Sequence, residues 1–216
     1  MTAINPRRVK AAKSSPRRRD LKLHRQEEIL AAAFKVFAAH GYEATRIDEV
    51  ARQAGIAKGT IYLYFRDKER LFRAVVRSLP QKRFDAVAQA FTGSAEDLLR
   101  DLLLRMYSQI VRNEKVRAIV RLLISEGGRF PQLTDIYHRE IIVPGMKALR
   151  HVLRKGVASG EFRETAATEF PQILAAPAVL AILWRVLHGE RYRLDFDAYM
   201  KAHLDFVLYG LRKKPA

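Results

Sequence analysis

The chain has 216 residues, and its 40 lysines and arginines against 23 aspartates and glutamates give it a formal charge of +17 at neutral pH. A surface this basic attracts polyanions, and 49% hydrophobic residues suffice for an ordinary core, which excludes a wholly disordered or collagen-like chain. The absence of cysteine excludes disulfides, a thiolate nucleophile and a cysteine-ligated zinc site, so we expect a reducing compartment.

The basic charge is concentrated at the start of the chain. Residues 1–25 hold nine basic residues and one acidic residue among prolines and serines, a composition that predicts a disordered arm over residues 1–23. We expect Arg17, Arg18 and Arg19 to contact DNA without sequence preference, either along phosphates or in a minor groove. A solubilising tail with no partner is the alternative interpretation of this charge.

The next segment has the periodicity of helices. From His24 onward, apolar residues recur at steps of three and four, which predicts a helix that ends at Gly41. Thr45 is the expected N-cap of a second helix of about ten residues, and Gly55 ends that helix. Both helices are therefore bounded by residues that favour helix ends.

A turn over residues 55–57 joins the second helix to another short helix over residues 58–65, after which Asp67 caps a longer one. Two short helices joined by such a turn form a helix-turn-helix, in which the second helix enters the major groove of DNA. Free amides at the start of that helix favour phosphate, and Gly59 lets its backbone approach DNA closely. These features predict a DNA-reading unit.

The rest of the chain is predicted to be almost entirely helical. Helices are expected over residues 95–112, 114–126, 131–160 with a bend at Pro144, 166–188, and from residue 196 onward. Ser94 is the expected cap of the first of these and Asp195 that of the last. The fold class is therefore all-α, with about nine helices. A three-helix helix-turn-helix domain is expected over residues 24–70 and a larger C-terminal helical domain over residues 71–216.

Four segments carry a family resemblance: FAAHGYEAT (37–45), EVARQAGI (49–56), KGTIYLYF (58–65) and KERL (68–71). Within residues 25–71 the sequence closely resembles the TetR/AcrR family of bacterial transcriptional regulators, in order and without a gap. Residues 122–162 more loosely resemble the C-terminal domain of AefR-type members. The first resemblance implies DNA contacts at Thr45, Arg46, Lys58, Gly59, Thr60, Tyr62, Tyr64 and Lys68.

Two positions depart from the family pattern. Ala57 stands before the reading helix, where many relatives have a serine or threonine that can cap it. Tyr64 stands where histidine is frequent, so a hydroxyl replaces an imidazole as the expected phosphate donor. The operator sequence therefore stays open. An aromatic cluster in the core is the alternative interpretation for Tyr62 and Tyr64, and the preferred one for Phe65.

The resemblance also implies that the C-terminal domain dimerises through its last helices and encloses a mostly apolar ligand pocket. Candidate pocket residues are the large or adaptable side chains Met106, Tyr107, Ile110, Tyr137, Met146 and Trp184. Ordinary core packing is the alternative for each of them. A homodimer would present two reading helices one turn of DNA apart, which implies a roughly palindromic operator.

Other classes of protein find no support in the sequence. The six histidines form no HExxH motif, and no glycine-rich phosphate loop or nucleophile elbow occurs, so we expect no enzyme, no catalytic or metal site and no cofactor. The longest uncharged stretch, residues 170–184, is shorter than the about 20 residues that a membrane span needs, so no membrane partner is expected.

The resemblance to the TetR/AcrR family therefore implies a homodimeric repressor that a small, mostly apolar ligand releases from double-stranded DNA. We expect it in the bacterial cytoplasm, associated with the nucleoid when DNA is bound. A ligand-responsive activator and a sequence-independent architectural DNA-binding protein remain as alternatives.

Overall fold

A computed structural model describes residues 16–79 and 91–213. Its elements are α1 (Pro16–Ala44), α2 (Ile47–Gln53), α3 (Lys58–Tyr62), α4 (Lys68–Ser78), α6 (Ala95–Arg112), α7 (Glu114–Glu126), α8 (Pro131–Tyr137), the π-helix η1 (His138–Ile142), α9 (Val143–Ala158), the 3-10 helix η2 (Ala166–Thr168), α10 (Gln172–His188) and α11 (Phe196–Leu211). Because α8, η1 and α9 form one continuous run, the described residues contain nine α-helical runs. The predicted all-α fold of about nine helices is confirmed.

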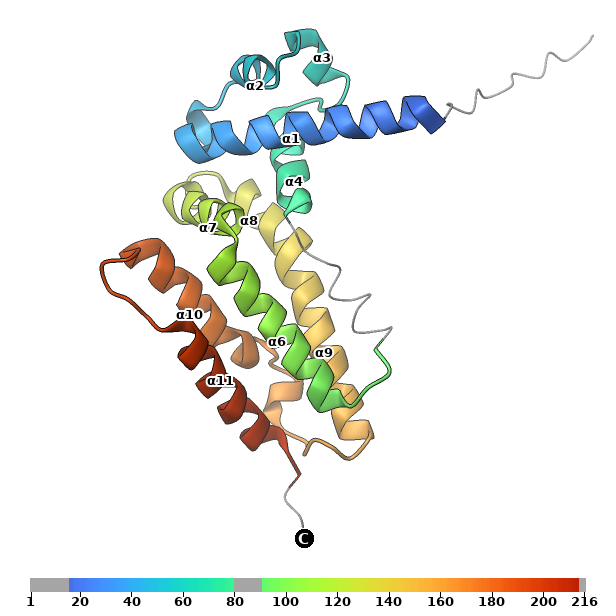
Figure 1. The fold of residues 1–216 in the computed structure, drawn as a ribbon, viewed down its shortest axis with the longest axis vertical. Helices are drawn as coiled ribbons and strands as arrows, with labels where there is room; N and C mark the ends of the chain where they lie inside the picture. The colour runs from blue at the N-terminus through green and yellow to red at the C-terminus, as the bar shows by residue number, and fades with distance from the viewer. Residues whose placement is uncertain (1–15, 80–90, 214–216) are drawn as a thin grey trace, which may run out of the picture.

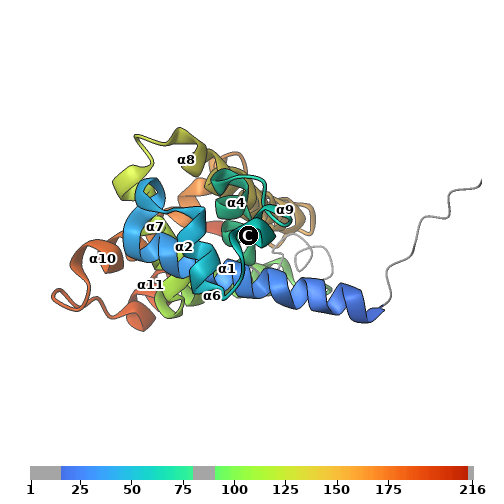
Figure 2. The same cartoon turned by 90° about the horizontal axis from the view of Figure 1, so that it is seen from above.

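The helices are arranged along the long axis of the molecule (Figure 1). At one end α1 lies across the axis, with α2 and α3 on its outer side. The helices α6, α9, α10 and α11 fill the other end, while α4, α7 and α8 lie between the two ends. Seen from above, the N-terminal half of α1 projects beyond the rest of the molecule (Figure 2). The helix-turn-helix therefore sits on an outer surface, away from the main bundle.

The first helix is longer than its sequence predicts. It begins at Pro16 rather than His24, so Arg17, Arg18 and Arg19 lie in a helix and the disorder expected for residues 16–23 is wrong. Proline suits the first helical position, and the arginine, leucine and lysine residues that follow are good helix formers. The side chains of the three arginines, and residues 1–15 of the predicted arm, lie outside the described part of the structure.

The predicted N-cap residues are confirmed at three helices, and the one predicted for α2 is wrong. Asp67, Ser94 and Asp195 each cap a helix by accepting a backbone N–H three residues later. Thr45 does not cap α2, because Arg46 occupies the N-cap position and provides no side-chain cap. Instead the Thr45 hydroxyl donates to the Gly41 carbonyl, and the residue is only 3% exposed. Its hydroxyl thus closes the end of α1.

The predicted domain border after residue 70 falls inside α4. Leu71, Phe72, Val75 and Val76 of this helix are buried in the same apolar cluster as the cores of α1, α2 and α3. That cluster continues into α7, α8 and α10, whereas a second cluster joins α6, α9, α10 and α11. The end of the molecule that holds the helix-turn-helix therefore shares its core with part of the C-terminal half.

We expected a bend at Pro144, and the structure has a π-helix just before this residue. The helical run widens over η1 directly before Pro144, which stands in the first turn of α9. Proline has no N–H to donate and its ring clashes with the carbonyl four residues earlier, in this case that of Glu140. A wider turn removes this clash, and single π-turns are frequent at functional sites.

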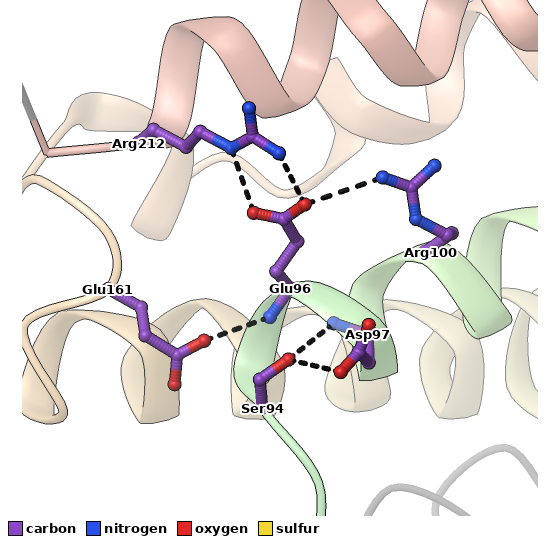
Figure 3. Close-up of polar contacts among 6 residues, drawn as sticks. All are labelled: Ser94, Glu96, Asp97, Arg100, Glu161 and Arg212. Atoms are coloured by element: carbon purple, nitrogen blue, oxygen red, sulfur yellow. Dashed lines mark hydrogen bonds and ion pairs between the residues drawn. The ribbon is translucent and has the colours of Figure 1, made fainter.

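A polar network closes the far end of the C-terminal half (Figure 3). The Glu96 carboxylate, at the start of α6, accepts hydrogen bonds from the guanidinium groups of Arg212 and Arg100. The Glu96 backbone N–H donates to the carboxylate of Glu161, which follows α9. The hydrogen bonds from Arg212 hold the pKa of Glu96 below its usual value. The network therefore joins the beginning of α6 to the end of α11.

Candidate functional site

The helix-turn-helix is held together by an apolar inner side. Val50 of α2, Ile61 of α3 and Phe65 after α3 are all buried in one cluster with α1. Gly55, in the turn between the two helices, has a positive φ of 65°, which glycine adopts without strain. The reading helix ends at Tyr62 rather than at Phe65, because the chain turns at Leu63. Phe65 belongs to the core, as the preferred interpretation had it.

The outer side of this unit is exposed to solvent. Arg46, Lys58, Gly59 and Tyr62 are exposed, while Thr60 and Tyr64 are half-buried. The Lys58 ammonium lies 2.8 Å from a carboxylate oxygen of Asp48, and this hydrogen bond raises the pKa of Lys58. A Cβ atom at Gly59 would meet nothing within 4 Å, so the backbone there is open to an approaching molecule. These six residues keep their predicted place on the surface.

Two residues that were predicted to contact DNA instead bind backbone carbonyls of the chain itself. Lys68 donates to the backbone carbonyls of Tyr42, Glu43 and Thr45 at 2.7, 2.9 and 3.2 Å, which accounts for all three ammonium protons. Its nitrogen also lies 4.6 Å from the centre of the Tyr42 ring, and burial lowers the pKa of Lys68. Lys68 therefore clamps the turn between α1 and α2. The buried hydroxyl of Thr45 is likewise directed inward, to Gly41.

Sequence reasoning missed three exposed residues on this unit. Leu63 follows the reading helix and is 81% exposed, and Arg52 and Arg66 are exposed as well. Leu63 lies between two tyrosines that were chosen for their hydroxyl groups. Its position in the same short segment was the signal that could have identified it, although a single exposed leucine is common on protein surfaces.

The C-terminal half contains an apolar cavity of about 150 Å³. Side chains from α6, α7, α8, η1, α9 and α10 line it, and Met106, Tyr137 and Met146 are among them, as predicted. Gln109 and the Tyr137 hydroxyl are the polar side-chain groups of its wall. Burial raises the pKa of Tyr137 to about 12, so this hydroxyl keeps its proton at neutral pH. The cavity therefore suits an uncharged group.

The other predicted pocket residues do not line this cavity. The Tyr107 hydroxyl hydrogen-bonds the Nδ1 atom of His203 in the core between α6 and α11, at 2.9 Å. Trp184 lies near the end of α10, where its indole N–H donates to the carbonyl of Tyr192. The side chain of Ile110 lies outside the described part of the structure. Helical periodicity alone does not distinguish a cavity wall from the core beside it.

An apolar stripe runs along the outside of α10 and α11. Ile173, Leu180 and Leu187 are exposed at seven-residue steps on α10. On α11, Phe206 and Tyr209 are 80% and 79% exposed. Exposed apolar patches of this kind mark interaction surfaces. No helix in the described ranges is long and apolar enough to cross a bilayer, and the same ranges hold no cluster of metal-ligating side chains.

Two protein-family models match the chain. Residues 29–75 match the model for bacterial regulatory proteins of the tetR family, and residues 90–195 match the tetracyclin repressor-like C-terminal domain. The fatty acid metabolism regulator protein of Bacillus subtilis is 24% identical over 192 residues, which cover 87% of this chain and 95% of that protein. The HTH-type transcriptional repressor KstR2 of Mycolicibacterium smegmatis is 29% identical over 145 residues, or 64% and 68% of the two chains.

Solved structures share the fold. The transcriptional regulator FadR from Bacillus subtilis, in complex with stearoyl-CoA, superposes with a TM-score of 0.68 at 22% identity and covers 85% of this chain and 98% of its own. The fatty acid degradation regulator FadR from Bacillus halodurans gives a TM-score of 0.66 at 22% identity, with 94% and 100% covered. Both support the same order of helices.

Proposed function

Because this chain belongs to the TetR family of bacterial transcriptional regulators, we propose that it is a homodimeric repressor that a mostly apolar small molecule releases from its operator. The observation that carries this proposal is the presence in one chain of an exposed helix-turn-helix face and a separate apolar cavity. A ligand-responsive activator would use the same two sites. A sequence-independent architectural protein would need only the first.

In the proposed complex, α3 enters the major groove of a roughly palindromic operator. The proposed contacts are the exposed or half-exposed residues Arg46, Lys58, Gly59, Thr60, Tyr62 and Tyr64. The segment of residues 26–70 carries no net charge, so its specificity depends on these few groups and not on bulk attraction. Such a regulator acts in the cytoplasm, on the nucleoid.

The projecting start of α1 is proposed to add affinity without specificity. A helix is about 10–12 Å wide and a minor groove about 6 Å, so a helical segment around Arg17, Arg18 and Arg19 fits phosphates better than a minor groove. We expect that removing residues 1–20 weakens binding to operator and random DNA about equally and lowers the salt dependence of both. Fluorescence anisotropy over a salt series measures this. A loss confined to the operator would contradict it.

The apolar stripe on α10 and α11 is the proposed subunit contact. Its side chains lie on two adjacent helices, and a second copy that covers them would create a symmetric four-helix contact. A dimer is also what a palindromic operator requires, because its two half-sites lie about one turn of DNA apart. Sedimentation of the chain and of a Leu180→Glu variant, which places a charge on the stripe, tests this contact.

The effector is proposed to insert an apolar group into the cavity. A volume of about 150 Å³ is enough for a benzene-sized group but below the roughly 300–1,000 Å³ of typical ligand sites, so a larger effector must separate the surrounding helices. An acyl chain is the first class to test. One relative is named for fatty acid metabolism, and one solved structure of this fold holds stearoyl-CoA.

A route from the cavity to the reading head runs through η1. Ile141 and Ile142 of this π-helix line the cavity. Glu140, in the same turn, pairs at 3.6 Å with Arg77 near the end of α4, which begins at the Lys68 clamp. Separation of the cavity walls is therefore expected to shift α4 and, in a dimer, to change the spacing of the two heads. Binding of the effector and of the operator would then oppose each other.

The test begins with selection of genomic DNA fragments on the purified protein. We expect enriched fragments that share a palindrome, an affinity at least about 1,000-fold above that for random DNA at fixed salt, and weaker binding when stearoyl-CoA is added. A ratio near one would instead support the architectural alternative. Transcription in vitro from the enriched promoter distinguishes a repressor from an activator.

A further inference from the structure

A carboxylate from the C-terminal half of the chain holds the turn between α1 and α2. Glu126 is the last residue of α7. Its Oε1 atom accepts a hydrogen bond from the backbone N–H of Tyr42, and its Oε2 atom accepts one from the N–H of Glu43, both at 2.9 Å. One side chain thus binds two consecutive amides that lie more than 80 residues away in sequence.

The position of this carboxylate is unfavourable for α7 itself. The C-terminal end of a helix carries partial negative charge, so an anionic side chain there is destabilising. The amides of Tyr42 and Glu43 directly follow Gly41, whose φ of 77° and ψ of −178° break α1. Amides that begin a new turn after such a break need an acceptor from elsewhere. Glu126 provides this acceptor, which gives its placement a purpose outside α7.

The same turn is held on its other side by Lys68. While Glu126 binds two of its N–H groups, Lys68 binds the carbonyls of Tyr42, Glu43 and Thr45. A methyl group at Gly41 would collide with the Glu126 carboxylate, so the glycine also makes room for the contact. Glu126 of α7 thus binds the N–H donors of the turn, and Lys68 of α4 binds its carbonyl acceptors.

Two further contacts from the segment after α7 reach the turn. The guanidinium of Arg129 pairs with the carboxylate of Glu43. The ring of Phe130 packs against that of Tyr42, with 5.5 Å between centroids. The contacts of Glu126, Arg129 and Phe130 with this turn thus connect the C-terminal half to the helix-turn-helix. The helix α2 begins only four residues after Glu43.

We propose that Glu126 is a positioning residue for DNA recognition, which fixes the orientation of the helix-turn-helix by binding the amides of Tyr42 and Glu43. The proposal rests on the proposed operator binding. A palindromic operator requires two heads at a set spacing, so a head that turns freely must be ordered when it binds, at a cost in affinity. Random DNA requires no such spacing. Loss of the contact should therefore weaken operator binding and leave random binding unchanged.

The test compares Glu126→Ala and Glu126→Gln with Glu164→Gln in the full chain. Glu164 is exposed and distant from the head, so its variant reproduces the charge change alone. The first measurement is hydrogen exchange of the Tyr42 and Glu43 amides without DNA. We expect about tenfold faster exchange in Glu126→Ala. Glu126→Gln should be intermediate, because an NH2 group, which cannot accept, replaces one of the two oxygens that each bind an amide.

The second measurement is the affinity for operator and for random DNA at fixed salt, well below the unfolding temperature of every variant. We expect operator affinity to fall about tenfold in Glu126→Ala, with random binding equal to that of Glu164→Gln. Unchanged exchange at both amides would overturn the proposal, and so would an equal loss on both DNAs or faster exchange with unaltered operator binding. If the wild-type chain selects no operator, the proposed function fails, whereas the exchange result still tests the contact.

Discussion

Around the turn between α1 and α2, backbone amides are bound by Glu126 and backbone carbonyls by Lys68. The cavity among α6, α9 and α10 is instead lined almost entirely by apolar side chains that leave about 150 Å³ unfilled, next to a π-helix. Hydrogen bonds have set directions, whereas apolar contacts can rearrange at little cost. From this comparison we expect the turn to keep one shape and the walls of the cavity to move when a ligand enters.

The largest effect is expected at Gly41. Gly41→Ala should lower the free energy of unfolding by about 3 kcal/mol, because its φ and ψ lie in a region open essentially only to glycine and the new methyl group meets Glu126. Denaturant unfolding measures this. Gly59→Ala is the matched control: the position is helical and open, so stability should rise by up to about 1 kcal/mol. Equal losses of stability in the two variants would contradict the conclusion that the turn is rigid.

A pair of substitutions distinguishes the roles of Lys68 and Lys58, which were both predicted to bind DNA. Lys68→Met should cost about 2 kcal/mol of stability, because three backbone carbonyls lose a charged donor. Lys58→Met should leave stability nearly unchanged, because it loses only an exposed pair, and should weaken operator binding instead. Thermal unfolding and anisotropy measure the two effects. The reverse pattern would return Lys68 to the DNA surface.

We expect that a larger side chain can fill the cavity without a large loss of stability. Ala175 lies in its wall, so Ala175→Leu should change the free energy of unfolding by less than about 1.5 kcal/mol. The same change should raise at least about tenfold the concentration of stearoyl-CoA needed to release the operator. Ala158→Leu, at the exposed end of α9, is the control for added volume. A wild-type response in Ala175→Leu would show that the effector binds elsewhere.

The smallest effect is expected before the reading helix. Ala57 is the N-cap of α3 and makes no side-chain cap. Its backbone is already extended, so Ala57→Ser should place a hydroxyl oxygen near the free amides and raise stability by about 1 kcal/mol. The control is Ala57→Val, which has no acceptor. A thermal midpoint in Ala57→Ser that is unchanged or lowered would mean that the amides already have an acceptor.

The roles that could be predicted from the sequence are those of residues whose partners lie only a few positions away along the chain. Asp67, Ser94 and Asp195 were identified as caps because each binds an amide three residues later. Trp184 was a candidate pocket residue, yet its indole N–H binds the carbonyl of Tyr192 in a loop. The residues that line the cavity come from four separate helical runs, which no periodicity within one helix can bring together.

The sequence alone determined the all-α class and the order of the helices, the helix-turn-helix and the family, because these depend on residues within about four positions of each other or on an ungapped motif. Only the tertiary structure decided what Thr45, Lys68 and Glu126 do. The ammonium of Lys68 binds carbonyls 23 to 26 residues away, and Glu126 binds amides 83 and 84 residues away. A charged side chain binds whichever unpaired backbone groups folding brings within its reach, and packing decides which groups those are.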